Sequence, residues 1–139
     1  MTPQEIAARL PELTGGLHDD DTIIALAQIT AEAIRALNHA TFPPGELSEP
    51  ATAYAVLGQL AAAAHRLPQL CGQLARWLAG ENTAGRLARS TGGLDDALDD
   101  VQASLDRAAR HATRLSEALD QAHQATAWLY RPDDGGEDR

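Results

Sequence analysis

The stretch that decides the fold runs from Leu94 to Leu129 and reads LDDALDDVQASLDRAARHATRLSEALDQAHQATAWL. Along it, eleven positions follow one another at intervals of four and three residues, and ten of the eleven are apolar. This spacing keeps one side of an α-helix facing a partner over about five heptads. The eleven positions are Leu94, Leu98, Val101, Leu105, Ala108, Ala112, Leu115, Leu119, Ala122, Thr126 and Leu129.

The columns of residues beside this stripe show what kind of helix it is. They are mostly small and uncharged, and most charged side chains lie on the opposite side of the helix. A free-standing two-stranded coiled coil instead carries Glu, Lys or Arg in these columns. We therefore expect a bundle helix packed between two or more others. The two flanking columns are Ala97, Ser104, His111, Ala118, Ala125 and Asp95, Gln102, Ala109, Ser116, His123, Tyr130.

Three further helices are expected before this one. A capping threonine and a proline predict a short helix over about 3–13, and three aspartates (19–21) precede an amphipathic one over about 21–40. Three adjacent aspartates lack the alternating ligand spacing of a calcium loop, so we interpret them as a helix cap. A second heptad stripe predicts a helix over about 50–79, kinked at Pro68. Its positions are Ala53, Leu57, Leu60, Ala64, Leu67, Cys71, Leu74 and Leu78.

Together these patterns predict an all-α protein, an antiparallel up-down helical bundle. Two long coiled-coil-like helices (50–79 and 94–130) are accompanied by one or two shorter helices at the N-terminal end. Residues 1–131 are expected to form one domain, and residues 132–139 a disordered acidic tail. The lone Cys71 excludes an internal disulfide, and we expect it to be a buried thiol.

Composition narrows the function. The chain has 139 residues, a net charge of −9 and no lysine, with a basic middle (50–93, +3) between two acidic ends (−6 each). Abundant Ala and Arg without Lys is typical of a GC-rich bacterium such as an actinobacterium. Because phosphate contacts need a positive surface, this charge argues against a general nucleic-acid-binding protein. No apolar run has the length of a membrane span, and no signal peptide begins the sequence, so a cytoplasmic protein is expected.

Catalytic motifs are missing from the sequence. It contains no Walker loop, no GxGxxG, no HExxH and no CxxC, and it lacks the Glu-x-x-His pairs of di-iron bundles. Asp120 and His123 are three residues apart, which fits a surface contact better than a metal site. The five histidines show no ligand spacing and are interpreted as residues at the edge of the bundle. We therefore predict a non-enzymatic protein without metal or cofactor.

Two groups of residues are candidates for a partner interface. Trp77, Trp128 and Tyr130 are the aromatic residues that the core stripes explain least; Trp128 and Tyr130 either anchor a partner or cover the end of the bundle. The second group consists of arginines, which either touch an acidic or phosphate-bearing partner or form ion pairs on a solvated surface, such as Asp106–Arg110 and Arg114–Glu117. These arginines are Arg86 and Arg89 in the predicted loop and Arg107, Arg110 and Arg114 on the last helix.

One segment resembles a known export signal. Tyr130-Arg131-Pro132-Asp133-Asp134 fits Tyr-x-x-x-Asp after a helical hairpin, and so resembles the signal of the small WxG-type substrates of type VII secretion. Those proteins are helical hairpins with Trp-x-Gly in the turn. Here Trp77-Leu78-Ala79-Gly80 has one residue more between Trp and Gly, the turn is longer, and two helices precede the hairpin. The resemblance implies a secreted substrate.

Three functional hypotheses follow. The main one is a protein–protein interaction or assembly module that self-associates. Its expected partners are another protein or a second copy of the chain, and no membrane is expected. The second is the type VII-like substrate, with Tyr130 and Asp134 as its export signal. The third is a regulator that binds an acidic or nucleic-acid partner through the arginines.

Overall fold

A computed structural model describes residues 9, 12, 19–43 and 47–132 of the chain. Within these residues every regular element is a helix: α2 (Asp20–Thr41), α3 (Pro50–Thr83) and α4 (Leu94–Thr126). The prediction of an all-α protein is therefore confirmed. The chain divides into two compact units, Met1–Leu47 and Ser48–Arg139, which are described separately below.

The first unit contains α2, which begins at an aspartate cap. The side chain of Asp19 accepts a hydrogen bond from the backbone N–H of Thr22 at 2.9 Å, which satisfies a donor that the first helical turn leaves unpaired. Asp20 and Asp21 follow in the first turn, where the helix dipole favours negative charge. No residue of α2 is buried. The predicted helix over 3–13 falls almost entirely outside the described residues.

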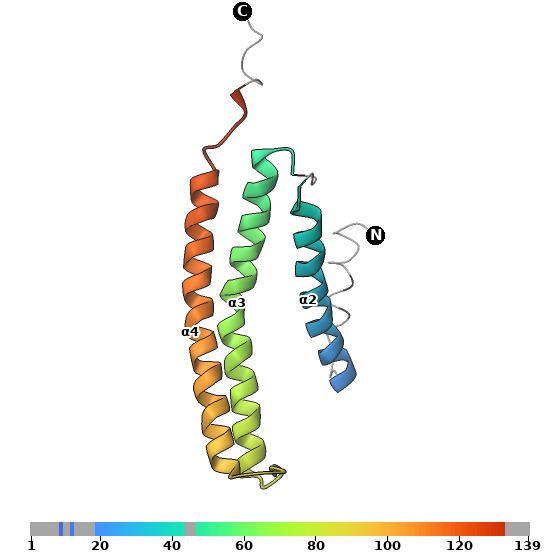
Figure 1. The fold of residues 1–139 in the computed structure, drawn as a ribbon, viewed down its shortest axis with the longest axis vertical. Helices are drawn as coiled ribbons and strands as arrows, with labels where there is room; N and C mark the ends of the chain where they lie inside the picture. The colour runs from blue at the N-terminus through green and yellow to red at the C-terminus, as the bar shows by residue number, and fades with distance from the viewer. Residues whose placement is uncertain (1–8, 10–11, 13–18, 44–46, 133–139) are drawn as a thin grey trace, which may run out of the picture. The chain divides into compact units, whose positions relative to one another are not determined.

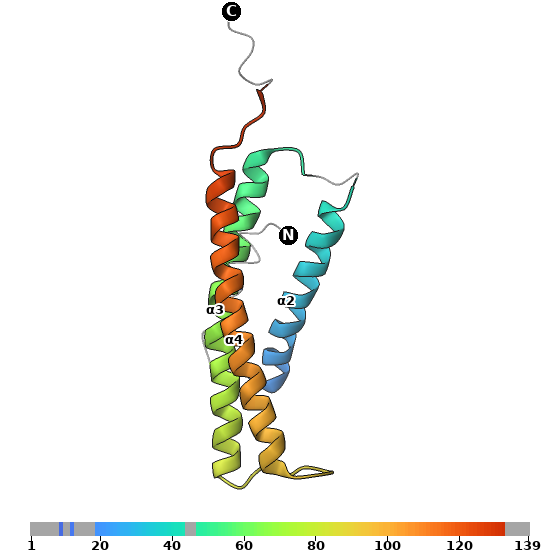
Figure 2. The ribbon, with the colours of Figure 1, turned by 60° about the vertical axis from the view of Figure 1, so that its left-hand side comes forward.

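The second unit is a helical hairpin. α3 and α4 lie side by side and run in opposite directions, joined at the yellow end of the ribbon by residues 84–93 (Figures 1 and 2). α3 continues through Pro68 without interruption. It ends at Thr83 and not at Ala79, because Gly80 stays helical and the first left-handed residue is Gly85, with φ of 71°. A glycine in this conformation is a common way to end a helix.

α4 ends at Thr126, four residues before the predicted end. Tyr54, in the second turn of α3, lies against His123, so α3 offers no further turns for residues 127–130 to pack on. The hydroxyl of Thr126 also donates to the carbonyl of His123, in competition with the backbone ladder. Arg131 then reaches back to the start of α3, where it donates to the Ser48 carbonyl and pairs with Glu49 at 3.8 Å.

None of the helices in the described part of the chain is long and apolar enough to cross a membrane.

Candidate interaction surface

The contact between α3 and α4, here called the seam, is built from small residues. The only buried side chains in the described residues are Ala61 and Ala64 of α3 and Ala112 and Ser116 of α4. Small side chains let two helix backbones approach closely, so the hairpin gains dispersion contacts but hides little apolar area from water. Leucines beside it, such as Leu57 and Leu105, are only half-buried, and no Leu, Ile or Val side chain of the described hairpin is fully buried.

Polar contacts fix the register along the seam. Gln102 of α4 donates through its side-chain nitrogen to the carbonyl of Ala75 on α3, at 2.9 Å. At the other end of the hairpin the rings of Tyr54 and His123 stack, with centroids 4.0 Å apart and planes inclined by 24°. In both contacts the two residue numbers add up to 177. Because the helices are antiparallel, any residue of α3 therefore lies at the same height along the hairpin as the residue of α4 whose number completes this sum.

Larger apolar residues lie on one side of the seam, on a surface here called the leucine face. Leu67 is 39% exposed and Leu115 is 50% exposed, although both belong to the apolar stripes that predicted the two helices. Leu74 and Val101 are also exposed, Ala108 is exposed, and Leu60 is half-buried. The leucine face consists of Leu60, Leu67 and Leu74 on α3 and Val101, Ala108 and Leu115 on α4.

Helix geometry places both halves of the leucine face on the same side of the hairpin. Leu67 follows the buried Ala64 by three residues, and Leu115 follows the buried Ala112 by three residues. Each leucine is therefore displaced by the same rotation, about 60°, from a residue of the seam. In two antiparallel right-handed helices, the same rotation away from the seam turns both side chains to the same side of the plane that contains the two helix axes. The six residues therefore form one continuous apolar surface. Contiguous exposed apolar surfaces are where interaction sites are commonly found, so the leucine face is a candidate for one.

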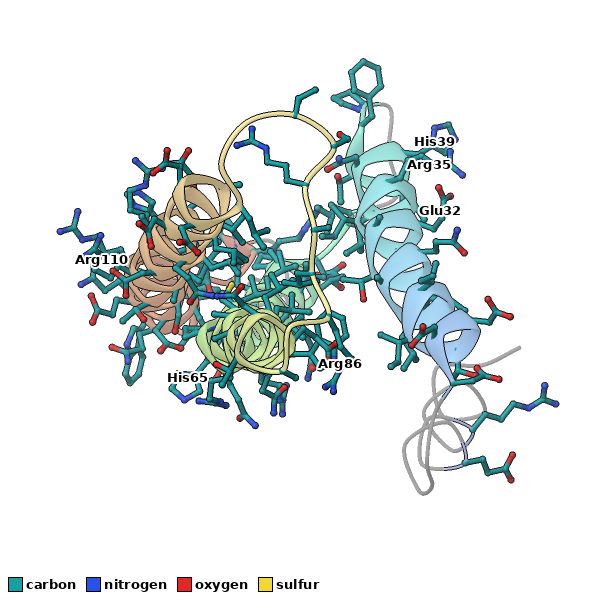
Figure 3. The ribbon with its side chains drawn as sticks, turned by 90° about the horizontal axis from the view of Figure 1, so that it is seen from below. Glu32, Arg35, His39, His65, Arg86 and Arg110 are labelled. Atoms are coloured by element: carbon teal, nitrogen blue, oxygen red, sulfur yellow. The ribbon has the colours of Figure 1, made fainter. Side chains whose placement is uncertain are left out.

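The opposite side of the hairpin carries a groove of about 350 Å³. Its floor is Gly58, where a Cβ atom would lie 2.9 Å from Nε2 of His123. The groove is lined by Gly58, Ala61, Ala62, His65, Arg66, Asp120 and His123. Figure 3 shows His65 projecting outward from α3, on the side away from the loop that joins the two helices. No group of three or more His, Cys, Asp or Glu side chains in the described segments is placed to hold a metal ion.

The predicted aromatic candidates lie at the two ends of the hairpin. Trp77 is exposed near the C-terminal end of α3, and it therefore lies inside a helix and not in the turn that a WxG-type hairpin would place it in. Trp128 is 85% exposed and Tyr130 is also exposed, both beyond the end of α4. Within the described residues Trp128 does not cover the end of the bundle. Asp134, the other half of the predicted export signal, lies outside the described residues.

The arginine candidates do not form one surface. Arg86 forms two hydrogen bonds of 2.7 Å with Glu81, and Arg89 donates to the Gly93 carbonyl, so both stabilise the loop. The Arg86 guanidinium lowers the pKa of Glu81, first through the hydrogen bond.

On α4, the predicted pair of Arg110 and Asp106 is present at 3.1 Å, and Arg107 donates to Ser104. The predicted pair of Arg114 and Glu117 is absent, and Arg114 has no ion-pair partner within the described part of the chain. Figure 3 shows Arg110 and Arg86 on different sides of the hairpin.

The heptad stripes predicted that the residues of the leucine face lie in the core, and none of them was among the predicted interface residues. The heptad stripe did contain the signal, because each helix has two apolar columns and a single neighbour covers only one side. The stack of Tyr54 on His123 was also missed. A glycine at position 58, one helical turn after Tyr54, was the local sign that a side chain from another helix approaches there.

The chain matches no known family model, and no match was found among curated proteins or solved structures.

Proposed function

We propose that this protein is a non-enzymatic helical interaction module that assembles with a second copy of itself through the leucine face. The observation that carries the proposal is the position of the leucines: both helices of the hairpin turn their larger apolar column to the same side, and that side is exposed. Covering it with another pair of helices would produce a four-helix bundle, which is the usual way to bury such a surface.

The small amount of apolar burial inside the hairpin supports a further layer of helices packed on the leucine face. The hairpin buries four small side chains, and each buried alanine contributes only about 1 kcal/mol or less from its methyl group. This is little against a conformational entropy cost of about 1–2 kcal/mol for each ordered residue. Burying the four exposed Leu and Val side chains of the leucine face from each copy would remove further apolar area from water. Association and folding are therefore expected to be coupled.

The net charges of the segments favour a second copy of the chain as the cover of the leucine face. α3 carries two arginines and one glutamate, a net charge of +1, whereas α4 carries seven acids and three arginines, a net charge of −4. The described residues 19–43 carry four acids and one arginine, a net charge of −3, whereas residues 48–132, which contain the hairpin, carry nine acids and eight arginines, a net charge of −1. A second hairpin therefore brings less negative charge to the interface than residues 19–43 would. An isologous interface also needs a self-complementary surface, which a single apolar face provides.

The test is the mass of the full chain in solution, measured by light scattering on a sizing column over a wide range of concentrations. We expect a species of twice 14.7 kDa, shifted toward the monomer by Leu67→Glu and by Leu115→Glu. Each substitution places a charge in the apolar interface, at a cost of several kcal/mol in association free energy, or roughly a hundredfold or more in dissociation constant.

Thr113→Glu is the matched control. Thr113 is exposed on the same helix, two residues before Leu115, and its side chain points about 160° away from that leucine. This variant changes the net charge equally and should leave the mass unchanged. A wild-type chain that stays monomeric at every concentration would refute the proposal. It would direct attention to the chain's own N-terminal unit or to a foreign protein as the cover of the leucine face.

A further inference from the structure

The charged residues at the border of the leucine face indicate how two hairpins would be oriented. On α4, the residue immediately before each member of the face is charged: Asp100 precedes Val101, Arg107 precedes Ala108, and Arg114 precedes Leu115. These three residues form a column of heptad spacing along the outer edge of the face. They are the charges closest to any partner that covers it.

Two of these three charges form no ion pair within the described part of the chain. Arg107 donates to Ser104, whereas neither Asp100 nor Arg114 forms an ion pair among the described residues. Arg110, which lies on the far side of α4, is already paired with Asp106. The border column therefore presents one free carboxylate and one free guanidinium, four helical turns apart, on either side of its centre.

A second copy can cover the face in two symmetric ways. In the first, both loops lie at the same end and α4 packs on α3 of the partner. In the second, the loops lie at opposite ends and α4 packs on α4 of the partner. Both arrangements place the two leucine faces in contact, so the apolar residues alone do not distinguish between them.

The register of the hairpin shows which arrangement the charges favour. The seam contacts place residue 77 of α3 at the level of Asp100, so the first arrangement would place Asp100 beside the uncharged Trp77 of the partner. Arg76 lies at a neighbouring level but points about 160° away from Leu74, and Arg66 lines the groove on the opposite side of the hairpin. The first arrangement therefore leaves Asp100 without an ion pair, and an interface with unpaired charges is disfavoured.

The second arrangement pairs the free charges. A two-fold axis through the middle of the face, at the level of Arg107 and Ala108, brings position 100 of one α4 to the level of position 114 of the other. Asp100 of each copy then lies beside Arg114 of its partner, which gives two ion pairs in each dimer. Arg107 meets its own copy on the axis, a single like-charge contact of long, exposed side chains.

From this geometry we infer that two copies pair with their loops at opposite ends, α4 against α4, and that Asp100 and Arg114 form reciprocal ion pairs across the two-fold axis. The inference rests on the proposed self-association and adds its orientation. It also assigns Arg114 a partner in the second copy.

Charge reversal tests the ion pairs in the full chain. Asp100→Arg and Arg114→Asp are each expected to weaken the dimer about tenfold, because each replaces two exposed ion pairs with two like-charge contacts. The double variant restores the pairs in reverse and should regain most of the lost affinity. Arg110→Asp is the matched control, since it makes the same charge change on the far side of the helix and should leave the affinity within about twofold.

Crosslinking tests the orientation independently. In a Cys71→Ala background, Ala108→Cys places one thiol on each side of the proposed axis, and a short bismaleimide should convert the dimer into a covalent one. Ala103→Cys, about 140° around the same helix, is the control and should not crosslink.

A dimer that Leu115→Glu dissociates, but that neither crosslinks through position 108 nor responds to charge reversal, would overturn this orientation and leave the proposed function intact. A chain that is monomeric throughout would overturn both.

Discussion

The seam and the leucine face use opposite kinds of residue three positions apart on the same helices. Ala64 is 3% exposed and holds the two helices of the hairpin together, whereas the adjacent Leu67 remains in contact with solvent. Small residues allow two helices of one chain to approach closely, and larger ones fill the wider space between layers. In this hairpin the closest packing is therefore made by its small residues, and several of its larger apolar residues stay exposed.

The largest expected difference between the seam and the leucine face comes from placing a glutamate in each of them. Ala64→Glu buries a carboxylate in the seam, with no cation to pair with and no room for its side chain. We expect a loss of more than about 3 kcal/mol and of the helical circular dichroism signal at every protein concentration. The measurement is urea unfolding followed by circular dichroism.

Leu67→Glu is the variant to compare with Ala64→Glu. Its carboxylate stays at the surface of a single hairpin, so the helical signal should return as protein concentration is raised, because only association is weakened. If both variants lose helix equally, and neither recovers with concentration, the seam and the face do not have the separate roles described above.

Heptad spacing was sufficient to predict the helices but not their neighbours. The stripe on α4 contains both Leu105, which lies toward the seam, and Val101, which is exposed on the leucine face. Periodicity defines a side of a helix about 100° wide, and two neighbours share that width. Which of its columns faces the hairpin partner depends on how closely the backbones approach, and this depends on residues of the other helix such as Ala61.

The candidate interface was harder to predict than the fold. Trp128 and Tyr130 were selected because they do not fit the stripes, and both are exposed. The leucines were excluded because they do fit the stripes. In a monomeric globular protein that reasoning is sound, since an apolar stripe is normally covered within the chain. In this hairpin only Ala61, Ala64, Ala112 and Ser116 are buried among the described residues, and leucines of the stripes such as Leu67 remain exposed.

A smaller effect on the free energy of unfolding is expected at Gly58, in the groove beside the seam. Gly58→Ala should gain about 1 kcal/mol of helix propensity, but its new methyl group would lie 2.9 Å from Nε2 of His123 and displace that ring from Tyr54. We therefore expect a gain well below this value in the wild-type background and the full gain in a His123→Ala background. The two differences are measured by urea unfolding as a double-mutant cycle. Equal gains would show that the imidazole moves freely and that this groove is loosely packed.

The smallest effect is expected at the loop end, where the contact between Glu81 and Arg86 belongs neither to the seam nor to the leucine face. Because Arg86 lowers the pKa of Glu81 below 4.5 in the folded chain, the unfolded chain binds a proton at this carboxyl more readily. The contribution of the contact to stability is therefore fully present above pH 4.5 and is lost as the pH falls through the lowered value. Wild type should be slightly more stable than Glu81→Gln at neutral pH, and the difference in urea midpoint should vanish in acid. Arg86→Gln removes the same contact and should show the same small loss at neutral pH. A difference that persists in acid would mean that the glutamine disturbs the end of α3 for a reason other than charge.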